Sequence, residues 1–143
     1  MLNDLLNSPA TNMLERTLNF TEARHQVILE NIANVSTPGY VQKDVSVQEF
    51  QQSLQAAMKN SQQGYNVPLQ PKSTQSIEFV SGSSDVVVHP KPVVTSTPFH
   101  DQGIRSMESL MGDLVDNAQV HNMAAQLLKS RYNQLTQAIQ MRV

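Results

Sequence analysis

The chain has 143 residues, which is about the length of one domain. Hydrophobic residues make up 39% and charged residues 15%, and both fractions are low for a globular domain. The sequence contains no cysteine, which excludes disulfides and excludes a thiolate as nucleophile or metal ligand. A net charge of −2 argues against general binding to nucleic acid or to an anionic membrane, because such binding uses a basic patch.

The first candidate helix begins at Ser8 and Pro9, because Ser can cap free backbone amides and Pro is tolerated at the first helical position. It ends before the Pro-Gly pair at 38–39, which favours a turn. Alternating steps of four and three define a heptad seam on one face: Leu14, Leu18, Thr21, His25, Ile28, Ile32 and Val35. We expect an N-terminal helix and its closing turn over residues 1–40.

A second, shorter helix is predicted within residues 41–60. Ser46 and Glu49 have the spacing of a capping box, and Val45 and Phe50 have the spacing of a hydrophobic staple. The apolar face of this helix comprises Phe50, Leu54 and Met58.

Residues 61–104 are interrupted by prolines, with Ser and Thr between them. Two β-prone runs, 77–80 and 86–88, are joined by the sequence Ser-Gly-Ser-Ser, which favours a hairpin. The spacing of the prolines prevents a large sheet. We expect an extended, partly disordered and poorly packed segment that contains one small β-hairpin.

Residues 105–143 have the clearest helical periodicity in the chain. Their seam again alternates steps of four and three: Met107, Met111, Leu114, Ala118, His121, Ala125, Leu128, Tyr132, Leu135 and Ile139. The sequence therefore predicts a mainly α fold, in which long N- and C-terminal helices pair as a coiled-coil-like bundle. The residues expected to form the assembly seam are Leu14, Leu18, Ile28, Ile32, Leu114, Leu128, Tyr132, Leu135 and Ile139.

The sequence contains no convincing catalytic or metal-binding pattern. Its histidines form neither an H-E-x-x-H nor an H-x-H arrangement, and it has no Gly-rich phosphate loop. We therefore expect a protein that is not an enzyme and that binds no cofactor, metal, nucleic acid or small-molecule substrate. His25 and His121 fall on the two seams, where each is either a tolerated polar residue or a marker of helix register. In an antiparallel pair the two histidines would lie at similar heights.

A ten-residue sequence closes the first helix: Asn31-Ile32-Ala33-Asn34-Val35-Ser36-Thr37-Pro38-Gly39-Tyr40. Its Asn-Ile-Ala-Asn and Thr-Pro-Gly-Tyr parts resemble the N-terminal signature of bacterial flagellar rod, hook and hook-associated proteins. The sequence Leu-Leu-Lys-Ser-Arg-Tyr at 127–132 is similar to the last helix of the proximal rod proteins in that family. The resemblance covers roughly residues 10–50 and 107–140.

The resemblance implies a structural subunit of the flagellar basal-body rod, which transmits torque from the motor to the hook. Such proteins pass through the flagellar type III export apparatus without a cleaved signal peptide, and they assemble in the periplasm. Their implied partners are other rod subunits and the membrane ring with its rod adaptor. The first eight residues lack the basic and apolar parts of a cleavable signal peptide, in keeping with that route. The alternative is a cytoplasmic coiled-coil adaptor or export chaperone, which has no use for the signature.

Overall fold

The computed structural model describes residues 8–62, 69–93 and 102–141. This part of the chain is mainly helical, as the sequence predicts. Its helices are α2 (Pro9–Ala33), α3 (Val47–Gln62) and α4 (Gln102–Gln140). Its strands are short: β1 (Lys43–Asp44), β2 (Ile77–Phe79), β3 (Val86–Val88) and β4 (Lys91–Pro92).

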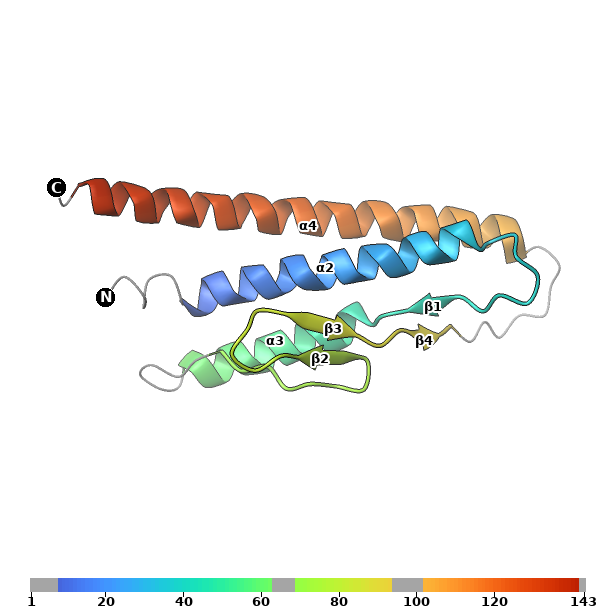
Figure 1. The fold of residues 1–143 in the computed structure, drawn as a ribbon, viewed down its shortest axis with the longest axis horizontal. Coiled ribbons are helices and arrows are strands. Elements are labelled where there is room, and N and C mark those ends of the chain that lie inside the picture. The colour runs from blue at the N-terminus through green and yellow to red at the C-terminus, as the bar shows by residue number, and fades with distance from the viewer. Residues whose placement is uncertain (1–7, 63–68, 94–101, 142–143) are drawn as a thin grey trace.

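Helix α2 lies between two other parts of the molecule (Figure 1). On one side α4 runs alongside it in the opposite direction, and on the other side lie α3 and the strands. Strands β2 and β3 form the expected antiparallel hairpin, with Glu78 opposite Val87. Strands β1 and β4 form a second antiparallel pair, with Asp44 opposite Lys91. The second pair joins the chain that follows α2 to the chain that follows the hairpin.

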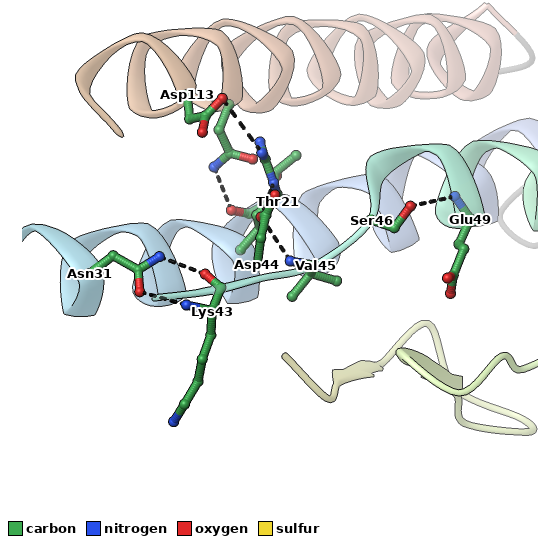
Figure 2. Close-up of polar contacts among 10 residues, drawn as sticks. Thr21, Asn31, Lys43, Asp44, Val45, Ser46, Glu49 and Asp113 are labelled. Atoms are coloured by element: carbon green, nitrogen blue, oxygen red, sulfur yellow. Dashed lines mark hydrogen bonds and ion pairs between the residues drawn. The ribbon is translucent and has the colours of Figure 1, made fainter. Parts of the chain in front are cut away.

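Two side chains cap the starts of α2 and α3, as their positions in the sequence predict. The Ser8 hydroxyl accepts a hydrogen bond from the Thr11 amide at 3.2 Å. The Ser46 hydroxyl accepts one from the Glu49 amide, also at 3.2 Å (Figure 2). Each bond satisfies a backbone donor that has no partner within the first turn of its helix.

The main hydrophobic core lies between α2, α3 and the hairpin. The rings of Phe20 and Phe50 are stacked with centroids 4.0 Å apart, and Phe79 stacks on Phe50 at 6.0 Å. The staple residues Val45 and Phe50 are both buried in this core. The buried members of the core are Phe20, Val27, Val45, Phe50, Leu54, Ala57, Leu69, Ile77 and Phe79.

The expectation of a poorly packed middle segment is wrong for residues 69–93. Leu69, Ile77 and Phe79 are buried there, and Ile77 is fully inaccessible. The reason is the alternation of side chains along a strand, which places Ile77 and Phe79 on the same face of β2, toward α3. The remainder of that expectation concerns 63–68 and 94–101, which lie outside the described residues.

Candidate functional site: the signature turn and the helix pair

Asn31 joins the end of α2 to strand β1 (Figure 2). Its Nδ2 donates to the Lys43 carbonyl oxygen at 2.6 Å, and its Oδ1 accepts from the Lys43 amide at 3.0 Å. The Tyr40 hydroxyl also donates to Oδ1, at 3.1 Å. Asn31 is only 3% exposed, so these bonds satisfy an amide that water cannot reach freely. The signature therefore fixes the direction in which the chain leaves the helix.

The second asparagine of the signature, Asn34, caps the C-terminal end of α2. Its backbone amide donates to the Glu30 carbonyl at 3.1 Å, and its side-chain Nδ2 donates to the same oxygen at 2.9 Å. The Asn34 carbonyl in turn accepts from the Thr37 amide at 2.9 Å. The carbonyls of a last helical turn lack partners within the helix, and Asn34 supplies donors for one of them.

Thr37 to Tyr40 form a tight turn that follows the cap. The Tyr40 amide donates to the Thr37 carbonyl at 3.2 Å, with Pro38 second and Gly39 third in the turn. Gly39 has a φ of 77°, and this combination is typical of a type II turn. Burial raises the pKa of the Tyr40 hydroxyl, and the nearby Glu30 carboxylate raises that pKa further. Both effects favour the protonated hydroxyl, which is the form that donates to Asn31.

Several polar contacts join α2 to α4. Asn117 is buried and donates to the Thr21 carbonyl at 2.8 Å, and the Thr21 hydroxyl lies 2.9 Å from Nδ1 of His121. Farther along, the Tyr132 hydroxyl donates to Glu15 at 3.1 Å, and this hydrogen bond raises the pKa of Tyr132. The expected match in height between the two seam histidines is inexact, because His121 contacts Thr21, one helical turn before His25.

Arg24 links three elements near this polar contact. Its side chain is 9% exposed, with Nε 3.5 Å from Asp44 of β1 and one terminal nitrogen 3.9 Å from Asp113 of α4. Arg24 Nε is close enough to Asp44 for an ion pair, but the two atoms do not form a hydrogen bond. Burial raises the pKa of Asp113, Arg24 opposes this, and Asp44 and Asp116 raise it further. Among the described side chains, negative charge is therefore in excess around Asp113.

Only some of the predicted seam residues are buried or half-buried in the single chain. Ile28 is buried, and the half-buried members are Leu14, Leu18, Ile32, Leu114, Leu128 and Leu135. Tyr132 and Ile139 are instead 41% and 47% exposed in the single chain. Helix α4 has 39 residues and α2 has 25, so α4 is about 20 Å longer and its last turns extend past the start of α2 (Figure 1).

The buried line of α4 is rotated by one residue from the predicted seam. Leu110, Asn117 and Ala124 are buried, whereas Met111 of the predicted seam is 46% exposed. These three residues are also seven positions apart. The sequence therefore contains a second row of residues with heptad spacing, directly beside the predicted seam. Ala118 and Ala125 of the predicted seam are half-buried beside the buried line.

A second face of α2 was missed altogether. Phe20 and Val27 are seven residues apart and point into the main core rather than toward α4. On the same side Arg16 is buried, lies over the ring of Phe79, and donates to the Ser83 carbonyl at 2.7 Å. Their heptad spacing could have revealed Phe20 and Val27, but nothing local to the sequence indicates a partner for Arg16.

Within the described ranges, no group of three His, Asp or Glu side chains could hold a metal ion. No helix of that part of the chain is long and apolar enough to cross a membrane. A comparison with protein-family models gives no match, and a comparison with curated proteins gives none either.

Proposed function

We propose that this chain is a structural subunit of the bacterial flagellar basal-body rod, most similar to the proximal rod protein FlgB. The observation that carries the proposal is the signature at residues 31–40, with Asn-Ile-Ala-Asn at the end of a long helix and Thr-Pro-Gly-Tyr in the turn after it. A role for these residues in directing the chain agrees with the proposal. Asn31 binds the outgoing backbone, Asn34 caps the helix, and Gly39 permits the turn.

The exposed surface of α4 supports a role in assembly. Large apolar side chains exposed along one helix are typical of an interaction surface. Those on α4 are Met111, Val115, Val120, Met123, Leu127, Tyr132 and Ile139, and Met141 follows the helix directly. In the proposed rod, neighbouring subunits cover these residues, and α2 and α4 acquire coiled-coil-like packing with the helices of those neighbours.

In this role the chain catalyses no reaction and binds no cofactor or small-molecule substrate. It passes through the flagellar type III export apparatus without a cleaved signal peptide and is incorporated into the rod in the periplasm. Its partners are other rod subunits and the membrane ring with its rod adaptor. The mechanical task requires a stiff subunit, and the antiparallel pair of long helices is suited to it (Figure 1).

Deletion of the gene tests the proposal. We expect a non-motile strain whose isolated basal bodies retain the membrane rings but lack rod and hook in electron micrographs, with both restored by a plasmid copy. Complete flagella and normal swimming in the deletion strain would contradict the proposal. Recovery of the protein from the cytoplasm in complex with secretion substrates would favour the adaptor or chaperone instead.

A further inference from the structure

Five residues of α4 form a continuous exposed stripe. Asp116, Val120, Met123, Leu127 and Arg131 follow one another in steps of four, three, four and four, so they share one face of the helix. Val120 is 50% exposed, Met123 64% and Leu127 51%. Among the described residues, neither Asp116 nor Arg131 has an ion-pair partner. We call these five residues the α4 stripe.

The α4 stripe is complementary to itself when its direction is reversed. Asp116 and Arg131 are equally far from a centre between Met123 and Ala124, and so are Val120 and Leu127. A second α4 that crosses at this centre in the opposite direction places Arg131 on Asp116 and Leu127 on Val120, at both ends of the contact. A parallel second helix instead places like charges on each other, which is unfavourable.

We propose that two copies of this chain pair through the α4 stripe as an antiparallel, two-fold symmetric dimer. The surroundings of Asp116 support this occupant. Among the side chains that the structure describes, the charges that act on Asp113 are the carboxylates of Asp44 and Asp116 and the cation of Arg24, so this part of α4 is complementary to Arg131 of a second copy.

A neighbouring cavity provides an apolar surface for the same partner. It has a volume of about 470 Å³ and lies between α2, α3 and α4. Its lining includes Asp116 and Val120 of the α4 stripe together with Phe20, Phe50 and Leu54 of the core. Leu127 of the second copy, opposite Val120, would therefore pack against the apolar rim of this cavity as well as against Val120 itself.

This dimer goes beyond the proposed function, because it concerns the free chain and does not depend on a role in the rod. A two-fold contact uses the same surface on both copies, so it closes and does not extend into a filament. The α4 stripe spans only about four helical turns, so the contact is small and the association is weak and depends on concentration.

Charge reversal tests the proposal on the full-length chain. Sedimentation equilibrium should give a concentration-dependent dimer, and Asp116→Arg or Arg131→Asp alone should weaken it at least tenfold. An equimolar mixture of the two variants should recover dimer, because both contacts then join opposite charges. The matched controls, Glu108→Arg and Lys129→Asp, make the same charge changes at exposed positions off the α4 stripe and should leave the association unchanged. Circular dichroism verifies that each variant is folded.

Cysteine cross-linking tests the direction, and the chain has no natural cysteine to interfere. A mixture of Val120→Cys and Leu127→Cys chains should form a mixed disulfide under mild oxidation, whereas Val120→Cys alone should form little. The proposal would be overturned if the chain were monomeric at every concentration or if charge reversal left the dimer unchanged. Efficient cross-linking of Val120→Cys chains to one another would also overturn it. Normal or absent motility in a deletion strain bears on the rod and leaves this result unaffected.

Discussion

The side chain of Asn31 binds both backbone groups of Lys43, accepting from its amide at 3.0 Å and donating to its carbonyl at 2.6 Å. An amide side chain offers a donor and an acceptor on two separate atoms, whereas a carboxylate lacks the donor and a hydrocarbon lacks both. The bond pair holds β1 against the end of α2. Strand β1 in turn carries Asp44 toward Arg24 and pairs with β4, so one signature residue organises the junction of α2, β1 and α4.

Replacement of Asn31 by Ala should therefore destabilise the chain by roughly 1 to 3 kcal/mol, because it removes two hydrogen bonds that a buried amide makes to the backbone of Lys43. The matched control is Asn34→Ala, since Asn34 makes its side-chain bond to Glu30 in an exposed position. It should lower the free energy of unfolding by less than about 1 kcal/mol. Urea unfolding of the two variants measures the difference, and equal effects would contradict the role assigned to Asn31.

Two glycine replacements should change stability in opposite directions. A Cβ atom would meet no other atom within 4 Å at either Gly39 or Gly112, so space does not distinguish the sites. Gly39→Ala forces alanine into a positive φ of 77° and should cost about 1 kcal/mol. Gly112→Ala lies inside α4 and should stabilise the chain by roughly 0.5 to 1 kcal/mol. Thermal unfolding measures both, and a stabilising Gly39→Ala would show that the turn is misassigned.

Asp113 should make the stability of the chain depend on pH. Its folded-state pKa is raised above the ordinary value of 3.8, so the folded chain holds the proton more tightly than the unfolded chain. Binding of this proton therefore adds to the free energy of unfolding. The contribution is fully present below pH 3.8 and is lost as the pH rises through the folded-state pKa of Asp113. Asp113→Asn should therefore gain stability relative to the natural chain between pH 3.5 and pH 7. The side chain is 44% exposed, so solvent screening keeps this change small.

Urea unfolding of both chains at the two pH values provides the measurement. The assignment would be contradicted if the difference in free energy of unfolding between the natural chain and the variant were the same at both pH values. It would also be contradicted if the natural chain became the more stable of the two at pH 7. Direct titration of the Asp113 carboxyl by NMR is an independent check on the direction of the pKa change.

Features that depend on a few adjacent residues could be predicted from the sequence. The caps at Ser8 and Ser46 and the turn at Pro38-Gly39 each involve partners three or four positions apart. The β2–β3 hairpin could be predicted for the same reason, because its strands are short and joined by a turn sequence. Local hydrogen bonding and periodicity are sufficient to define such features.

The remaining features depend on contacts between distant segments. Asn31 and Lys43 are 12 residues apart, and Arg16 and Ser83 are 67 apart, so no local pattern joins them. The buried line of α4 was missed by one residue because two adjacent lines both have heptad spacing. Which of the two lines is buried depends on how α4 packs against α2, where Asn117 binds the Thr21 carbonyl. The packing of the hairpin on α3 likewise depends on the stacked rings of Phe50 and Phe79.

Replacement of Leu128 by Glu should prevent assembly of the proposed rod while export continues. Leu128 is half-buried on the seam of α4, where a charge would oppose packing against another helix. Gln126→Glu adds the same charge at an exposed position and should assemble normally. The measurement compares the amounts of each variant inside the cell, outside the cytoplasm and in isolated basal bodies. Normal rods that contain the Leu128→Glu chain would refute the packing role.

The most direct test of the central claim is mass spectrometry of purified hook–basal bodies from cells that produce the natural chain. The proposed role predicts that the chain copurifies with the rod in a fixed ratio to the membrane-ring proteins and is removed only when the rod itself is removed. Absence of the chain from intact basal bodies, with the protein instead bound to secretion substrates in the cytoplasm, would contradict it.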